Sequence, residues 1–245
     1  MHCDMRKYSV IILVLLLSNI LTLSVVYKLE KKTNYIKHYL ERQRGIKQSK
    51  LELPAAYWCI QGWSNTLEKL NYDCDVCFFG HSHIEESDFR FYFPDKRIVN
   101  LGYPGDNIGG MLLRVEQIKS VQPEKIFVMA GVNSLWMPKD EFECMYDSLL
   151  TKIQTEVPHA ELYIFNILPQ SNGILGNNNE NSKIKEYNEL LFKYATHKRI
   201  QLIDLYSIYV DSEGNLISSL TYDGVHLKKE AYSSWAARIK PFIDD

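Results

Sequence analysis

The chain has 245 residues and a formal net charge of −2 at pH 7. Hydrophobic residues make up 46% of it and charged residues 24%, which is typical of a folded globular protein and argues against a disordered chain. The balanced charge also argues against a general nucleic-acid-binding protein, because such proteins carry a marked excess of Lys and Arg. We therefore expect a folded protein whose partner is not a nucleic acid.

The N-terminal part of the chain has the composition of a membrane anchor. Residues 8–27 form an apolar run of about twenty residues, long enough to cross the roughly 30 Å hydrocarbon core of a bilayer as a helix. No convincing small-x-small cleavage site follows, which favours an uncleaved anchor over a removed signal peptide. We expect residues 1–27 to be a single-pass anchor and the charged residues 28–52 to be a helical stalk, with binding to the membrane surface as a lesser alternative for the stalk.

The charges beside this run give two answers about its orientation. Seven basic residues lie between positions 28 and 47, against Arg6 and Lys7 before the run, and this count favours a cytoplasmic C-terminal part. A short basic N-terminus before an apolar run is typical of the opposite orientation. Both orientations stay open on charge alone.

Residues 53–245 are expected to form one domain. Apolar runs rich in β-branched and aromatic residues predict strands at about 75–79, 97–101, 125–130, 161–166 and 200–204. Between strands, apolar residues recur at helical spacing in two places: Phe142, Met145, Leu149 and Ile153, and then Ile184, Tyr187 and Leu191. This alternation predicts the α/β class, as a three-layer α/β/α sandwich around a flavodoxin-like parallel sheet of about five strands.

Two segments far apart in the chain carry the residue types of nucleophilic catalysis. The sequence GHSH at 80–83 follows the first predicted strand, and DGVH at 223–226 lies near the C-terminus. A serine hydroxyl becomes a good nucleophile when a histidine takes its proton and a carboxylate orients that histidine. Side chains three residues apart in a helical turn project from the same side, so Asp223 is expected to reach His226. Ser82 must then meet His226 across the fold.

Each segment also has a purely structural interpretation. Asp223 is a preferred N-cap residue, and a periodic run from Lys228 to Ile239 follows it. Ser82 has the interpretation of an ordinary turn serine. We favour the catalytic interpretation because the two segments occur together.

The loops after the second and third predicted strands offer hydrogen-bond donors. Gly105 lacks a Cβ, so its backbone N–H can approach a substrate oxygen closely, and the side-chain amide of Asn133 is a second donor. The carboxyl ends of parallel strands lie at one edge of a sheet, so these groups and the N–H of Ser82 are expected to meet there. Together they predict an oxyanion hole, although each residue alone is also a common turn residue.

The four segments, in this order, resemble the signature blocks of the SGNH, or GDSL-like, hydrolase superfamily of serine esterases and acylhydrolases. Its four name-giving residues correspond here to Ser82, Gly105, Asn133 and His226, with Asp223 as the partner of the histidine. The resemblance covers about residue 55 to the end. It implies a Ser82–His226–Asp223 triad, an oxyanion hole formed by Ser82, Gly105 and Asn133, and no metal or organic cofactor.

Two positions depart from the family pattern, and one string has a rival interpretation. His81 and Ser134 stand where the family usually has Asp, which alters the support of the loop after the first predicted strand. Two histidines flanking one residue also resemble a metal-binding loop of calcineurin-like metallophosphoesterases. The stretch from 53 to 71 lacks the Asp-x-His and Gly-Asp loops that such enzymes have, so we expect no metal site. His83 is expected to line the cleft or lie at the surface.

The sequence therefore predicts a membrane-anchored serine esterase, acting outside the cytoplasm as the resemblance implies. The expected substrate is an O-acylated glycan, an envelope sugar or another small ester, with acetyl as the acyl group. Trp136 is expected either to floor a sugar-binding cleft or to pack in the core, and residues 170–181 to shape the acyl pocket through a mobile loop. A non-catalytic glycan-binding protein and an O-acyltransferase that uses the same acyl-enzyme remain as alternatives.

Overall fold

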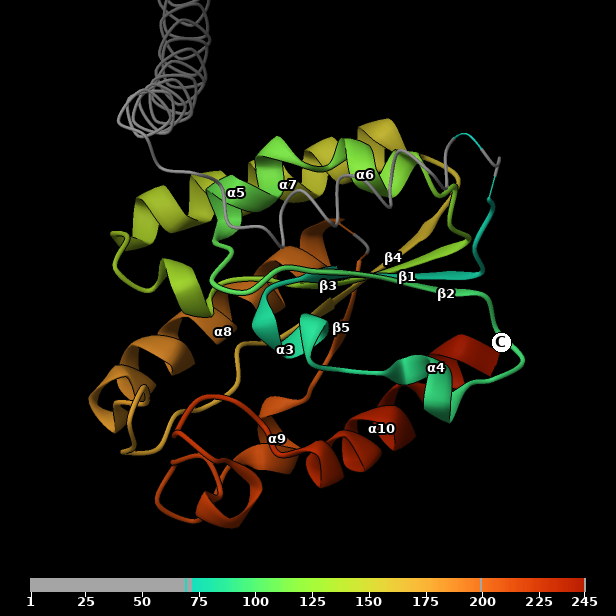
Figure 1. Ribbon diagram of the computed structural model, residues 1–245. Helices are drawn as coiled ribbons and strands as arrows, with labels where there is room; N and C mark the ends of the chain where they lie inside the picture. The colour runs from blue at the N-terminus through green and yellow to red at the C-terminus, as the bar shows by residue number, and fades with distance from the viewer. Residues whose placement is uncertain (1–68, 70–71, 199, 245) are drawn as a thin grey trace, which may run out of the picture. The chain divides into compact units, whose positions relative to one another are not determined.

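The computed structural model describes Lys69, residues 72–198 and residues 200–244 (Figure 1). The predicted anchor at 1–27 and the predicted stalk at 28–52 lie outside the described residues. Within the described part of the chain, no helix is both long and apolar enough to cross a membrane.

The centre of the fold is a parallel sheet of five strands in the order β2-β1-β3-β4-β5. The strands are β1 (Val76–Gly80), β2 (Ile98–Gly102), β3 (Lys125–Met129), β4 (Glu161–Phe165) and β5 (Gln201–Ile203). The ends of each differ from the predicted ends by one residue at most. The α/β class and the flavodoxin-like strand order are confirmed.

The order of the strands places the first one at the point where the chain reverses its direction across the sheet. β1 pairs with β2 on one side and with β3 on the other, and Gly80 is level with both Gly102 and Met129. The three strands therefore end together. Ligands of open parallel sheets bind beyond the carboxyl ends of the strands at such a switch point.

Helices cover both faces of the sheet, which makes the three predicted layers (Figure 1). The longer ones on one face are α5 (Ile108–Leu113), α7 (Lys139–Glu156) and α8 (Asn181–Lys198), with the short α6 (Glu116–Lys119). On the other face lie α4 (Phe89–Tyr92) and α10 (Tyr232–Asp244), and the remaining short helices are α3 (Ser82–Glu85) and α9 (Tyr206–Tyr209). Single 3₁₀ turns are η1 (Val132–Ser134), η2 (Asn178–Glu180), η3 (Ser218–Leu220) and η4 (Lys229–Ala231).

Both helices predicted from apolar spacing are present. α7 begins directly after Pro138, whose fixed φ suits the start of a helix, and its predicted apolar positions are buried. α8 buries Ile184, Tyr187 and Leu191 in the same way. Their burial against the sheet, more than their helix propensity, stabilises these segments.

An aromatic cluster fixes the C-terminal helix to the sheet. Trp235 of α10 is fully buried, and its ring lies 5.1 Å from that of Phe165 in β4, edge to face. In the sheet, the ring of Phe78 in β1 stacks on that of Phe127 in β3, with the two ring centroids 5.1 Å apart. Such rings bury large apolar areas and add about 0.5–1.5 kcal/mol for each well-oriented pair. The cluster therefore anchors the segment just before α10, which carries residues 221–227.

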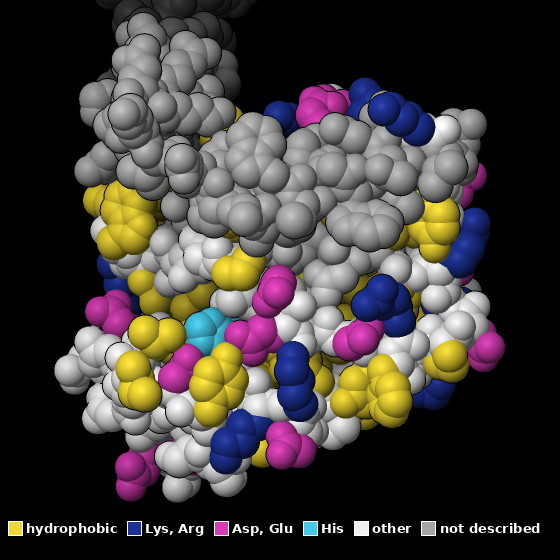
Figure 2. Space-filling view, in the orientation of Figure 1, with side chains coloured by type: hydrophobic (Ala, Val, Ile, Leu, Met, Phe, Trp, Pro, Cys, Tyr) yellow, Lys and Arg dark blue, Asp and Glu magenta, His cyan; other side chains and the backbone are white. Residues whose placement is uncertain are grey.

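The first helix after β1 packs directly on the end of β2. A Cβ on Gly102 would collide with the backbone of Glu85, so only glycine allows α3 to approach this closely. The tight contact holds α3 at the carboxyl edge of the sheet. On the described part of the surface in Figure 2, basic side chains are interspersed with acidic ones, as the near-zero net charge predicts.

Candidate active site

Three side chains from opposite ends of the domain form a hydrogen-bonded chain. Ser82 is the first residue of α3, and its Oγ lies 2.8 Å from Nε2 of His226. Nδ1 of His226 lies 2.6 Å from Oδ2 of Asp223. The structure thus brings together the three residues that the sequence predicts for nucleophile, base and orienter.

The roles of the two imidazole nitrogens follow from their partners. An ionised carboxylate only accepts hydrogen bonds, so Nδ1 of His226 carries the hydrogen that it shares with Asp223. In a neutral ring Nε2 then accepts the hydroxyl hydrogen of Ser82. This is the tautomer that a general base beside a serine requires.

The predicted contact between Asp223 and His226 forms, but not in a helical turn. Residues 222–226 are a bend, closed by a bridge between Thr221 and Leu227. Oδ1 of Asp223 accepts the backbone N–H groups of Val225 at 2.9 Å and His226 at 2.7 Å, a tight turn that the side chain itself makes. Asp223 is therefore not the N-cap of the last helix, which starts only at Tyr232.

These hydrogen bonds keep the carboxylate ionised. Burial alone would raise the pKa of Asp223, which is only 7% exposed, but the hydrogen bonds from the His226 ring and from two backbone N–H groups outweigh burial and lower its pKa. An anion held in this way fixes the orientation of the imidazole.

The loop after β4 is hydrogen-bonded to the turn that carries Asp223. Ser171 donates its backbone N–H to the carbonyl of Gly224, while Leu175 and Gly176 donate theirs to the carbonyl of Asp223, all within 2.9–3.1 Å. The sequence predicts a mobile loop at 170–181 that shapes the acyl pocket. The structure shows this loop hydrogen-bonded to the backbone of the turn at 222–226.

The two other predicted donors lie on the neighbouring loops. Gly105 follows β2 with a φ of 72°, a conformation that favours glycine, and a Cβ there would meet open space. The backbone conformation is thus one reason for this glycine. Asn133 lies in η1 after β3, and its side-chain amide donates one hydrogen to the carbonyl of Asp106 at 2.9 Å, which leaves its second hydrogen for another acceptor.

Ser134, one of the two departures from the family pattern, has a structural partner. It is fully buried, and its hydroxyl accepts the backbone N–H of Ile108 at 3.1 Å, at the start of α5. Together with the bond between Asn133 and Asp106, this contact joins the loop after β3 to the loop after β2.

A buried ion pair also supports these loops, and no pattern in the sequence indicates it. Nε of Arg114 lies 2.6 Å from Oδ2 of Asp106, with both side chains below one tenth exposed. The guanidinium also donates to the carbonyls of Leu101 and Gly80, each at 2.8 Å. One side chain therefore ties the ends of β1 and β2 to the loop that carries Gly105.

The two histidines beside the nucleophile are buried. His81 caps the N-terminus of α3, with its Nδ1 3.4 Å from the backbone nitrogen of His83. His83 is 2% exposed, so the expectation that it lines the cleft or lies at the surface is wrong. In the described part of the chain, no three His, Cys, Asp or Glu side chains gather in a way that would hold a metal ion.

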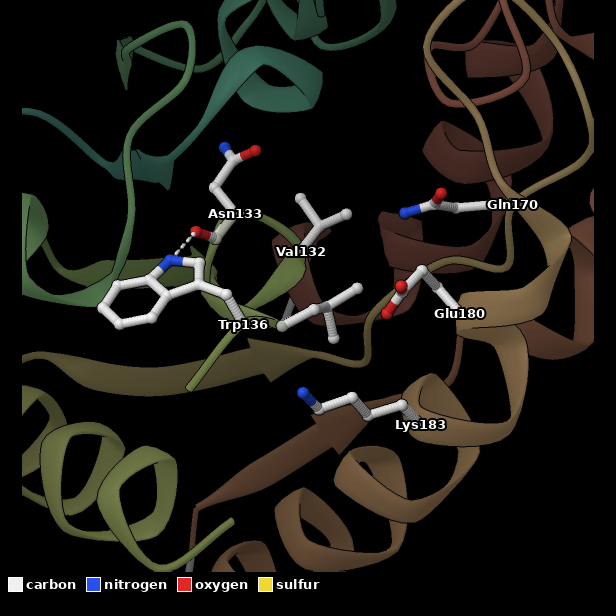
Figure 3. Close-up of a pocket in the computed structure, with 7 residues that line it drawn as sticks. Val132, Asn133, Trp136, Gln170, Glu180 and Lys183 are labelled. Atoms are coloured by element: carbon white, nitrogen blue, oxygen red, sulfur yellow. Dashed lines mark hydrogen bonds between the residues drawn. The ribbon is translucent and has the colours of Figure 1, made fainter. Parts of the chain in front are cut away.

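A cavity of about 350 Å³ lies beside Asn133 (Figure 3). It is lined by Val132, Asn133, Leu135, Trp136, Gln170, Glu180 and Lys183. Trp136 is 55% exposed and donates its indole N–H to the carbonyl of Asn133 at 3.1 Å, so the core-packing alternative for this residue is wrong. On one side of the cavity lie Val132 and Trp136. Figure 3 shows the polar ends of Gln170, Glu180 and Lys183 pointing toward that side.

Comparisons with known proteins agree with this architecture. The model of the GDSL-like lipase/acylhydrolase family matches residues 66–233. Platelet-activating factor acetylhydrolase IB subunit alpha2 from Gallus gallus is 25% identical over 197 residues, which cover 74% of this chain and 84% of that protein.

Two solved structures share the fold at low sequence identity. A Bacteroides fragilis protein assigned as an acylhydrolase has a TM-score of 0.67 and 22% identity, over 75% of this chain and 95% of its own. The acetyl xylan esterase AlAXEase has a TM-score of 0.56 and 22% identity, over 68% of this chain and 98% of its own. The family match covers well over half of the chain. The chain therefore belongs to the GDSL-like lipase/acylhydrolase family, whose members are esterases and acylhydrolases.

Proposed function

We propose that this protein is a serine esterase that removes an acetyl group, or a similarly short acyl group, from an O-acylated sugar. The observation that carries the proposal is the hydrogen-bonded chain from Ser82 through His226 to Asp223. Such a chain converts a serine hydroxyl into a nucleophile at neutral pH.

In the proposed first half-reaction, Ser82 Oγ attacks the ester carbonyl while its proton passes to Nε2 of His226. Asp223 stabilises the imidazolium that forms, because its carboxylate accepts the Nδ1–H bond. His226 then gives the proton to the departing sugar oxygen. The bond between the acyl carbon and that oxygen breaks, and the acyl group stays on Ser82.

The negative charge on the tetrahedral intermediate needs donors that are already in place. The backbone N–H of Ser82 is available because the first residues of a helix have no acceptor within it. The N–H of Gly105 and the free amide hydrogen of Asn133 complete the proposed oxyanion hole. Each such donor contributes about 10²–10³ in turnover.

In the second half-reaction, water replaces the sugar. His226 takes a proton from water as the water oxygen attacks the acyl carbon, and it then returns a proton to Ser82 Oγ as the acyl–enzyme bond breaks. The products are the free carboxylic acid and the free enzyme. The mechanism needs no metal or organic cofactor.

The cavity beside Asn133 supports a sugar as the leaving group. Sugar rings pack an apolar face on aromatic side chains and bind polar side chains through their hydroxyl groups. The cavity offers both, with Trp136 on one side and Gln170, Glu180 and Lys183 on the other. The similarity to an acetyl xylan esterase and to an acetylhydrolase supports acetyl as the acyl group.

Attachment to a membrane is a second part of the proposal and rests on the sequence alone. The apolar run at 8–27 supports a single-pass anchor, and the short basic N-terminus before it supports an esterase domain outside the cytoplasm. Reporter enzymes fused after residue 245, one active only in the cytoplasm and one only outside, decide the side. Activity of the cytoplasmic reporter would overturn this part.

A substrate panel tests the esterase proposal. The full-length protein and its Ser82→Ala variant are assayed with acetylated xylo-oligosaccharides, p-nitrophenyl acetate, a long-chain p-nitrophenyl ester and an acetylated ether lipid. The proposal predicts acetate release from the first two by the parent only. Cleavage of the lipid or the long-chain ester with the sugars untouched would contradict the substrate class, and acetyl transfer to an added sugar in place of acetate release would identify a transferase.

A further inference from the structure

His83 joins the nucleophile's helix to the loop that carries the base. Its Nε2 lies 3.0 Å from the carbonyl oxygen of Val225, the residue directly before His226. A carbonyl only accepts, so Nε2 carries the hydrogen of this bond. The bond fixes the peptide group that leads into His226 from α3, the helix that begins with Ser82.

A second bond from the same residue fastens the other end of that loop. Tyr232, the first residue of α10, donates its hydroxyl to the backbone carbonyl of His83 at 2.9 Å. The loop with Asp223 and His226 is therefore held to α3 both just before the base and where the last helix begins. Both bonds are inside the protein, since His83 and Tyr232 are each 2% exposed.

The neighbouring histidine sets the orientation of the His83 ring. Nδ1 of His83 lies 3.3 Å from Nδ1 of His81, and the two rings meet edge to face. A neutral His83 with its hydrogen on Nε2 can only accept at Nδ1. His81 Nδ1 accepts the backbone N–H of His83 at 3.4 Å, so the cap holds the His81 ring at the start of α3, edge to face with the ring of His83.

Neutrality of His83 matters because its ring lies 5.5 Å from that of His226. Burial, together with the nearby His226, lowers the pKa of His83 to about 4, so the ring is uncharged near neutral pH. A cation at this place would oppose the imidazolium that forms on His226 during the reaction. An uncharged donor holds the loop without that cost.

We propose that His83 is a positioning residue that holds His226 at hydrogen-bond distance from Ser82, and that His81 orients His83. The proposal rests on the proposed esterase function and adds to it a residue outside the proposed triad and oxyanion hole. It also gives the departure at His81 a purpose, because the His81 ring caps α3 and packs edge to face against the ring of His83.

Two substitutions at position 83 separate the hydrogen bond from packing. His83→Phe fills a similar volume without a donor, and His83→Gln keeps an N–H donor at a similar reach. Displacement of a catalytic group by about 1 Å typically costs about 100-fold in rate. We therefore expect His83→Phe to lower kcat for p-nitrophenyl acetate about 10- to 100-fold with KM within about twofold, and His83→Gln to recover most of the loss.

Ser87→Ala is the matched control. Ser87 is buried just beyond α3 and donates its hydroxyl to the carbonyl of Ile84, without a bond to the loop at 221–227. We expect this variant to lose stability but to keep the kcat of the parent. Equal losses in His83→Phe and His83→Gln, or a kcat within twofold of the parent in His83→Phe, would overturn the proposal.

A proton NMR measurement keeps the test independent of turnover. The Nδ1–H of His226, shared with Asp223 at 2.6 Å, is expected to give a strongly downfield resonance, which a His226→Gln variant assigns. The resonance should persist in His83→Gln and shift or broaden in His83→Phe. If the parent neither turns over nor reacts with a fluorophosphonate, the esterase proposal fails. An unchanged resonance in His83→Phe would then overturn the positioning role, and a changed one would support it.

Discussion

The side-chain amide of Asn133 donates to the backbone carbonyl of Asp106 at 2.9 Å, so the loop after β3 is fastened to the loop after β2. The bond fixes the orientation of the amide and leaves its second hydrogen for a substrate oxygen. One residue thus links two of the loops that the proposed oxyanion hole requires.

Replacing Asn133 should therefore affect turnover more than binding. We expect Asn133→Ala to lower kcat about 10²–10³-fold with a small change in KM, because the lost bond is strongest in the transition state. Steady-state kinetics with p-nitrophenyl acetate measure this, with circular dichroism as the control for folding. A rise in KM at unchanged kcat would show that Asn133 contributes uniform binding and not an oxyanion contact.

Removing the buried guanidinium should destabilise the fold. Arg114→Met leaves the Asp106 carboxylate buried without its partner, and loss of one member of a buried pair typically costs about 3–5 kcal/mol. The double variant Arg114→Met with Asp106→Asn should recover part of this loss, since no charge is then left unpaired. Urea unfolding of the parent and both variants measures the free energies. A loss below about 1 kcal/mol in Arg114→Met would contradict the support assigned to this ion pair.

Acidification should destabilise the protein through its buried histidines. Burial lowers the pKa of both His81 and His83, the nearby His226 opposes the protonation of both, and Arg114 opposes that of His81. The unfolded chain, with histidine pKa values near about 6.5, therefore binds more protons than the folded chain below that pH. Stability is fully present above about pH 6.5 and falls as the pH drops toward 4, by up to about 1.4 kcal/mol per pH unit for each histidine.

Urea unfolding at pH 7, 6 and 5 measures this dependence. The His83→Phe variant lacks one of the two buried groups, so its stability should decline less steeply with falling pH than that of the parent. Parallel declines in the two proteins would mean that His83 is not the group whose protonation opposes folding.

The cavity beside Asn133 should determine which leaving group the enzyme prefers. Lys183→Met removes a charged donor that points into the cavity, so KM for acetylated xylo-oligosaccharides should rise about tenfold. The rate with p-nitrophenyl acetate, which is too small to fill the cavity, should stay unchanged. Lys193→Met, on an exposed position of α8, is the matched control. Equal KM values for the sugar in both variants would exclude the cavity as the sugar site.

The sheet and the residues of the proposed triad were predictable from the sequence for a local reason. Each strand is a short run of apolar, β-branched or aromatic residues, and each predicted site residue follows such a run or belongs to a compact segment such as DGVH at 223–226. The contact between Asp223 and His226 was also predictable, although a carboxylate-capped turn and not a helical turn makes it.

The support around the site was not predictable because it depends on contacts between distant segments. Nothing near Arg114 in the sequence indicates that its guanidinium reaches the carbonyl of Gly80, 34 residues earlier. The same is true of His83, whose partner Val225 lies 142 residues away. Polar residues between predicted strands are expected to be exposed. Only the packed fold shows that Arg114 and His83 are buried and hydrogen-bonded.

Covalent labelling of the nucleophile tests the central claim most directly. The intact mass of the full-length protein is measured after exposure to a fluorophosphonate, beside that of its folded Ser82→Ala variant. An activated Ser82 predicts one added phosphonyl group on the parent and none on the variant. A folded parent without an adduct, or equal labelling of both proteins, would contradict Ser82 as the catalytic nucleophile.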